Sequence, residues 1–178
     1  MRCSIPFAPI FWLLLLPALS DCEKSTPPKT ELEKLPPITS TGRFTFGCLV
    51  NGEAKVAGNT LDVPASYQFG MLQITGVVGE GTMAIHLYID DTLIKPVPFT
   101  VTFDSFPHTH GVISYITDRG GCYGRTDGSS ENTGSITITR FDHSNLIVSG
   151  IFNFELKLPG SCGSFTITEG RFDTQFTP

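Results

Sequence analysis

A period of two in the apolar side chains most constrains what this chain can fold into. Between positions 82 and 90 every second residue is apolar, and the same alternation returns at 99–103, 136–139 and 152–158. Successive side chains of a strand point to opposite faces of a sheet, so the pattern predicts half-buried strands. No window carries a long helical stripe, and an all-β fold follows.

Glycine- and asparagine-containing turns divide the chain into about eight strands, a spacing typical of all-β domains. The sequence therefore predicts a single antiparallel β-sandwich or a partly open β-barrel. Segments 44–50 and 67–78 carry apolar residues on both faces, as expected for strands that are covered twice or change sheet. Near the C-terminus the apolar parity reverses, and a β-bulge at Glu169-Gly170 would restore it.

The N-terminal residues have the pattern of an export signal. Arg2 precedes an apolar run, Ile10 to Leu16, that is far shorter than the roughly 20 residues of a membrane-spanning helix. We therefore interpret residues 1–21 as a signal peptide.

Two cleavage sites are compatible with this signal. Leu19-Ser20-Asp21-Cys22 is similar to a bacterial lipobox, which predicts a lipid on Cys22 and an anchor in the membrane. Ala18-Leu19-Ser20 also fits an ordinary secretory peptidase, which would release a soluble secreted protein that begins at Asp21.

Residues 22–41 have the composition of a tether. Lysine and glutamate balance there, and two proline pairs favour extended backbone. One helical turn at Thr30 to Leu35, capped by Thr30 and Glu33, is compatible with that spacer. The expected organisation is a signal peptide at 1–21, a lipidated cysteine and proline-rich tether at 22–41, and an all-β domain at 42–178.

Charge and aromatic content restrict the partners. The chain has 12 Lys and Arg against 17 Asp and Glu, a net charge of −5 that disfavours nucleic acid. Trp12, the only tryptophan, lies in the signal peptide. Four tyrosines could therefore serve a glycan or protein partner: Tyr67, Tyr88, Tyr115 and Tyr123.

His108 and His110 form the main candidate metal-binding pair. In an extended segment the two imidazoles would lie on one face, a spacing used for transition metals. Three carboxylates could complete such a site: Asp90, Asp91 and Asp104. Pro107 and Gly111 bracket the pair, which favours an exposed loop, and no metal is assigned.

Other chemical signals are weak. Residues 127–132 offer oxygen ligands but lack the spacing of a calcium loop, and a polar hairpin tip explains them. Residues 160–163 have Cys162 where a hydrolase elbow would need serine. His86 and His143 are expected on a strand face and in a turn. We assign no catalytic residue and no cofactor.

Three cysteines remain in the domain. Cys122 and Cys162 lie in glycine-rich turns that could meet, which predicts a disulfide in an oxidising compartment, with two unpaired thiols as the alternative. Cys48 lies in an apolar strand and is expected to be a buried thiol.

Four segments resemble an uncharacterised lipoprotein family from Bacteroidota. They are LPPITSTG at 35–42, TFGCLVNG at 45–52, VSGIFNF at 148–154 and ITEGRFD at 167–173. The resemblance implies an outer-membrane lipoprotein on the periplasmic or the cell-surface face. It implies a domain of unknown function and no catalytic residues.

Asp91-Thr92-Leu93 resembles the O-glycosylation pattern of such envelope proteins, in which an aliphatic residue follows Asp-Ser/Thr. The resemblance implies a glycan on Thr92.

Together these features predict a cell-envelope lipoprotein, anchored in the membrane through Cys22, whose domain is a non-catalytic binding or structural module. Its partner would be a protein or a glycan. The alternative is a metal-dependent enzyme that uses the region of His108 and His110.

Overall fold

The protein was analysed as a computed structural model. It describes residues 29–103, 108–117, 120–127, 129, 131–158 and 160–178. These residues form eleven strands, one short helix and three 3-10 turns, and they confirm the expected all-β, sandwich-like fold.

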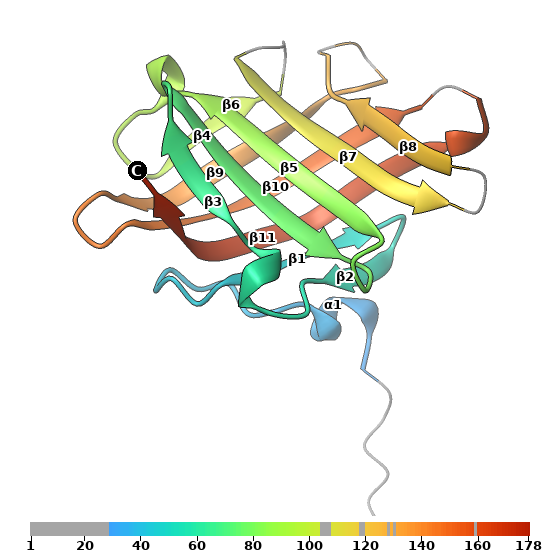
Figure 1. Cartoon of the computed structure of the whole chain (residues 1–178), viewed down its shortest axis with the longest axis horizontal. Helices are drawn as coiled ribbons and strands as arrows, with labels where there is room; N and C mark the ends of the chain where they lie inside the picture. Colours follow the sequence, from blue (N-terminus) through green and yellow to red (C-terminus); the bar gives the residue numbers. More distant parts are fainter. Residues whose placement is uncertain (1–28, 104–107, 118–119, 128, 130, 159) are drawn as a thin grey trace, which may run out of the picture.

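The strands lie in two layers, one behind the other in Figure 1. The first sheet has the order β2 (Glu53–Val56), β1 (Thr45–Val50), β11 (Ser164–Thr177), β10 (Ile147–Lys157), β9 (Gly134–Asp142) and β6 (Phe99–Thr102). The second sheet, in front, has the order β3 (Ala65–Gln68), β4 (Met71–Val78), β5 (Met83–Asp90), β7 (Thr109–Thr117) and β8 (Gly120–Arg125).

Two segments add strands that the alternation did not predict. Residues 67–78, expected as one strand, are divided by a turn at Phe69 and Gly70, whose φ angles are +53° and +74°. The glycine-rich β8 shows no alternation because β10 approaches it closely. A Cβ at Gly124 would lie 1.8 Å from the Leu158 side chain.

The expected β-bulge in β11 is confirmed. Leu49 pairs with Thr168 and Gly47 with Arg171, so β11 contributes one extra residue between these pairs. Glu169, at the bulge, has a φ of +54°. The extra residue returns the apolar side chains on both sides of the bulge to the interior.

β11 also joins the two sheets. It runs antiparallel to β1 and β10 in the first sheet, and its last residues pair in parallel with β3, where Phe176 lies opposite Ala65. Among the described residues no pairing connects β6 with β8, so the layers do not close into a barrel.

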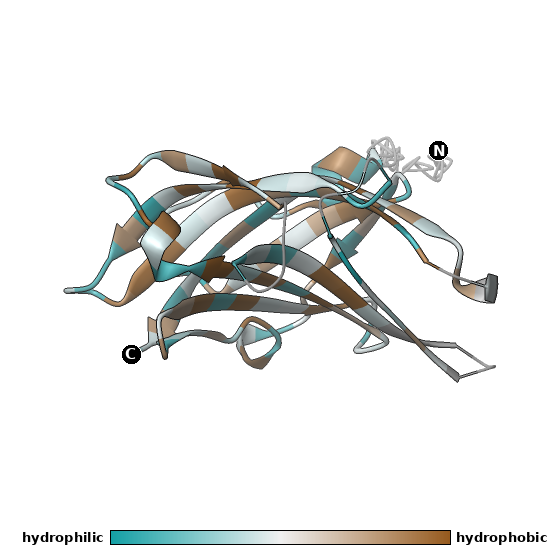
Figure 2. Ribbon diagram, turned by 90° about the horizontal axis from the view of Figure 1, so that it is seen from above, coloured by the Kyte–Doolittle hydropathy of each residue, from teal (hydrophilic) through white to brown (hydrophobic). Residues whose placement is uncertain are grey.

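The hydrophobic core fills the space between the layers. Figure 2 shows the two layers edge-on, with apolar and polar residues alternating along the strands. Phe46 of β1 crosses the interior to β4, where a Cβ at Gly76 would lie 2.1 Å from its ring. The ring of Phe46 also lies 5.2 Å from that of Phe152 in β10. The glycine in β4 is therefore a packing requirement.

Residues 30–42, here called the N-terminal strap, lie against the domain. The expected helical turn is α1 (Glu31–Lys34), with the capping box of Thr30 and Glu33. Glu31 accepts a hydrogen bond of 2.9 Å from the Ala54 amide of β2. A Cβ at Gly47 of β1 would lie 2.7 Å from Pro36, which shows how closely the strap crosses the sheet.

The strap lies within the segment 22–41 expected as a tether, and it contacts the domain at several points. The sequence did not reveal these contacts because Asp173 of β11 and Arg140 of β9 lie a hundred or more positions from the strap residues that they bind.

Candidate functional site

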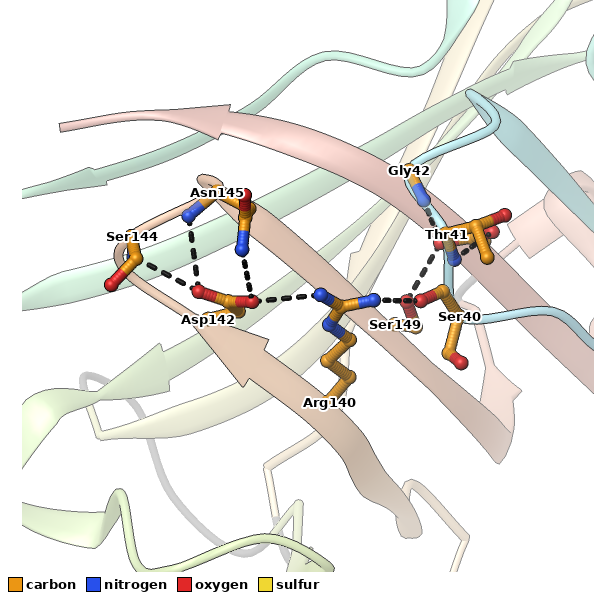
Figure 3. Close-up of polar contacts among 9 residues, drawn as sticks. Ser40, Thr41, Gly42, Arg140, Asp142, Ser144, Asn145 and Ser149 are labelled. Carbon is orange, nitrogen blue, oxygen red and sulfur yellow. Dashed lines mark hydrogen bonds and ion pairs between the residues drawn. The ribbon is translucent and has the colours of Figure 1, made fainter.

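Three segments far apart in the sequence meet around one buried carboxylate, that of Asp173, which is 1% exposed. Its Oδ2 accepts hydrogen bonds from Thr39 Oγ1 at 2.7 Å and from the Thr41 amide at 2.9 Å. Its Oδ1 accepts bonds from the Gly42 amide and from Ser149 Oγ, both at 2.7 Å. Three of the four donor residues, Thr41, Gly42 and Ser149, are labelled in Figure 3.

These bonds hold the carboxylate in its charged form. Burial alone would raise the pKa of Asp173, but the hydrogen bonds from Thr39, Thr41, Ser149 and Gly42 outweigh burial and lower it. Because every bond holds the strap or β10, this network organises the fold.

Arg140 of β9 adds a second clasp on the strap. Its guanidinium donates to the Ser40 carbonyl and, at 2.7 Å, to Asp142 Oδ2 (Figure 3). Asp142 in turn accepts bonds from the amides of Ser144 and Asn145 in the turn that follows β9.

The best candidate for recognition lies on the outer face of the second sheet. Five side chains gather there on β5, β7 and β8, and we call them the outer ladder: His86, Tyr88, His110, Tyr123 and Arg125. Tyr88 lies opposite His110, and Val112 lies opposite both His86 and Arg125. Residues directly opposite in antiparallel strands share a face, so the register places these side chains on one surface.

Close contacts order the centre of the ladder. The rings of Tyr88 and His110 stack with their centroids 4.5 Å apart and their planes 14° apart. His86 Nδ1 lies 2.9 Å from the Thr75 hydroxyl of β4, within hydrogen-bonding distance. The centre of the ladder is therefore pre-organised.

The ladder carries neutral imidazoles at neutral pH. Burial lowers the pKa of His110 to about 4, with a further contribution from the nearby charge of Arg125. Burial also lowers the pKa of His86. Burial and Tyr123 raise the pKa of Tyr88. The ladder therefore offers hydroxyl, imidazole and guanidinium groups with a single positive charge from Arg125.

The rim of the ladder faces solvent. Tyr123 is 63% exposed, whereas His110 is 5% exposed. Tyr123 also borders a shallow groove of about 390 Å³, which Ala84 and Ser114 of the neighbouring strands help to line. A partner would meet the ring of Tyr123 first.

The two histidines of the candidate metal pair differ in burial. His108 is exposed, and its Nδ1 lies 3.2 Å from Asp90 Oδ2. His110 lies in β7 and is the buried member of the ladder. The expectation of an exposed loop is therefore wrong for this residue. Gly111 is part of β7 because the Phe154 ring packs against it: a Cβ there would lie 3.1 Å from that ring.

Among the described residues, no group of three or more histidine, cysteine or acidic side chains could hold a metal ion. Asp104 lies outside the described residues.

In the polar segment at 127–132, the Asp127 side chain binds near neighbours in the sequence. Asp127 accepts bonds from the Ser129 amide at 3.0 Å and from Asn132 Nδ2 at 3.3 Å. The segment leads from β8 in the second sheet to β9 in the first, so it connects the sheets and is not the expected hairpin tip.

The cysteine assignments are confirmed. Cys122 of β8 forms a disulfide with Cys162, in the turn before β11, and their Cα atoms are 5.9 Å apart. Cys48 is a free, buried thiol whose pKa burial raises to about 12. His86 and His143 lie on a strand face and in a turn, as expected.

Of the two residues expected to be modified, only Thr92 lies within the described part of the chain. Thr92 lies in the exposed turn η2 (Asp91–Leu93), and its hydroxyl donates a 2.6 Å bond to Asp90 Oδ1. Cys22 lies outside the described residues, as do residues 1–21, expected as a signal peptide, and residues 23–28 of the expected tether.

The other two candidate tyrosines, Tyr67 and Tyr115, are not part of the ladder. Tyr67 packs its ring against Phe141 and His143 near the junction of the sheets. The side chain of Tyr115 lies outside what the structure describes. The sequence identified Tyr88 and Tyr123 singly, but their meeting depends on the pairing of β5, β7 and β8.

Comparison with known proteins found no matching family model, no matching curated protein and no matching solved structure. Within the described part of the chain, no helix has the length and apolar character needed to span a membrane.

Proposed function

We propose that this protein is a cell-envelope lipoprotein that binds a protein partner through the outer ladder. The observation that carries the proposal is the gathering of Tyr88, His110, Tyr123 and Arg125 on the outer face of one sheet. Tyrosine and arginine are the residues most enriched at the energetic centres of protein interfaces.

The shape of the surface favours a protein over a small ligand. The ladder lies across three neighbouring strands, and the groove beside Tyr123 is shallow and open. A folded partner can cover a flat face of this kind, whereas small ligands prefer enclosed pockets. The partner would bury the Tyr123 ring and place an acceptor near Arg125.

Site-specific photo-crosslinking in the native envelope tests this proposal. A photo-reactive phenylalanine at position 123 should give an adduct of defined mass, and Arg125→Ala should abolish that adduct in protein that still shows a cooperative melting transition. The same probe at Thr100 of β6, which is exposed on the other sheet, is the matched control. Equal adducts at both positions, or an adduct indifferent to Arg125, would contradict the proposal.

The anchoring proposal rests on Cys22 and the preceding Leu19-Ser20-Asp21. The resemblance to the Bacteroidota lipoprotein family also supports an outer-membrane location, periplasmic or surface-facing. Cys22→Ser should move the protein from the membrane fraction to the soluble fraction. Unchanged fractionation, or no acyl-chain labelling of the unmodified sequence, would favour the soluble secreted alternative.

A further inference from the structure

A groove of about 370 Å³ lies where β11 passes from one sheet to the other. Along this edge of β11, β1 pairs as far as Asp173 and β3 begins at Phe176. The strands β1 and β3 diverge at this point, and we call the hollow between them the seam groove. It borders the outer ladder, because its lining residue Thr75 lies 2.9 Å from His86, but a ligand in it would need no protein partner.

The lining of the seam groove carries no charge. Eleven residues line it, five of them apolar and six ending in a hydroxyl or amide group. Gln73 and Gln175 supply the amides, and Thr75 is among the hydroxyl residues. A charged ligand would lose part of its hydration there and find no countercharge, which costs several kcal/mol. A neutral ligand would avoid that cost.

Leu61, on the rim, is exposed in a way that folding does not require. This apolar side chain is 87% exposed, at the middle of the 3-10 turn η1 (Thr60–Asp62). The turn has a capping box in which the Leu61 amide donates to Asn59 Oδ1 at 2.8 Å. Leu61 is therefore presented to solvent by an ordered turn, beside a groove that its side chain could help to close.

Phe44 supplies a second, independent signal. Its φ angle is +55°, in the left-handed region, where a bulky residue costs about 1–2 kcal/mol. Backbone strain of this kind concentrates at binding sites, where the surrounding structure maintains it. The two largest apolar side chains of the seam groove are thus one strained residue and one exposed residue.

We propose that the seam groove binds a neutral amphiphile. Its aliphatic part would lie between Leu61 and Phe44. Its hydroxyl or amide head group would form hydrogen bonds with Gln73 and Gln175. The groove volume is at the lower end of the range for small-molecule sites, which suits a short chain.

Octyl glucoside, below its micellar concentration, is a suitable probe. Calorimetry would use the protein carrying Cys22→Ser, so that no attached acyl chain competes. We expect saturable binding of octyl glucoside and at least about tenfold weaker binding of octyl sulfate and octyltrimethylammonium, which have the same tail and a charged head. Glucose alone should not bind measurably.

Variants locate the site. Leu61→Asp should weaken octyl glucoside binding by about tenfold or more, the loss expected for one leucine contact, and Gln175→Leu should weaken it less. Both side chains are exposed, so the melting temperature should not change. The matched control is Phe69→Asp, a fully exposed apolar residue on the β3–β4 turn, which should bind normally.

Equal binding of the neutral and charged probes would overturn the proposal, and so would normal binding by Leu61→Asp. Absence of octyl glucoside binding would also overturn it. Photo-crosslinking at position 123 is unaffected by any of these results, so the two proposals succeed or fail separately.

Discussion

At the scale of single residues, Asp173 connects distant parts of the chain through one side chain. Each of its two carboxylate oxygens accepts two hydrogen bonds, and three of the four donors belong to the strap. None of these four donors is a basic side chain, so the charge is stabilised by oriented neutral donors. A substitution should therefore release the strap and destabilise the domain together.

Asp173→Asn tests this role. The amide nitrogen of Asn would face donors that previously met an oxygen, so we expect a loss of about 2–3 kcal/mol in the free energy of unfolding at pH 7. Urea denaturation measures it. Glu131→Gln, which changes an exposed carboxylate, is the control and should have little effect.

The same variant should change the acid response. The pKa of Asp173 is lower in the folded protein, so its ionised form stabilises the fold above the unfolded value of about 4. That contribution disappears as the pH falls through the folded value. The difference in stability between the native sequence and Asp173→Asn should therefore narrow on acidification, and a constant difference would refute the assignment.

Burial of His110 should make the free energy of unfolding depend on pH in a second range, above that of Asp173. Its pKa of about 4 in the fold is below the unfolded value of about 6.5, so the unfolded chain binds a proton first. Stability should fall as the pH drops from about 6.5 to 4, by up to about 1.4 kcal/mol per pH unit. His110→Phe should reduce this slope in urea denaturation, and the remainder would come from His86, whose pKa burial also lowers, whereas His143→Phe, in an exposed turn, should leave the slope unchanged.

At the scale of elements, the turn between β3 and β4 has a backbone conformation that suits asparagine better than the phenylalanine found there. Phe69 is 103% exposed and adopts φ of +53°, followed by Gly70 at +74°. Two consecutive residues with positive φ are the geometry in which Asn-Gly is preferred. The phenylalanine gains no burial that would offset this strain.

Phe69→Asn should therefore stabilise the protein by about 1 kcal/mol and raise the melting temperature by about 2–4 °C. Phe69→Val, equally free of burial but β-branched, should lower it. Calorimetric melting of the three proteins decides the matter. A lower melting temperature for the asparagine variant would mean that Phe69 makes a stabilising contact.

The elements that could be predicted from the sequence are those specified by residues close together in the chain. The capping box of Thr30 and Glu33, the bulge at Glu169 and the alternating strands β5 and β10 are readable because each depends on neighbours in sequence. The division at Phe69 was missed because phenylalanine carries no turn signal. β7 and β8 were missed because their glycines serve packing against Phe154 and Leu158, which only the tertiary structure defines.

The candidate site was less predictable than the fold. Tyr88 and Tyr123 could be selected from the sequence as amphipathic aromatics, but the seam groove could not. Leu61 and Gln175 are more than a hundred positions apart and meet only because β11 changes sheets. No local pattern encodes that meeting.

At the scale of the whole molecule, the disulfide joins the two layers at β8, the edge strand of the second sheet, far from the β11–β3 pairing that also connects them. Cys122 lies in the edge strand β8 of the second sheet, and Cys162 precedes β11 of the first, with 40 positions between them. A closed loop of this size restricts the unfolded chain and can stabilise the fold by about 4 kcal/mol in the chain-entropy treatment.

Cys122→Ser combined with Cys162→Ser should therefore lower the free energy of unfolding by about 2–4 kcal/mol. Urea denaturation of the native sequence under reducing conditions should give the same loss. Cys48 should react with iodoacetamide only in urea, because burial keeps it a thiol. Equal stability of the oxidised and reduced protein would contradict this role.

The docked strap also determines how far the domain can travel from its anchor. If Cys22 carries the lipid, the leash from the anchor to the strap is residues 22–29, at most about 28 Å when fully extended. A strap released from Asp173, Arg140 and β2 together would lengthen the leash to residues 22–41, or about 70 Å. The contacts of the strap would then set whether the domain stays close to the membrane surface or reaches partners well beyond it.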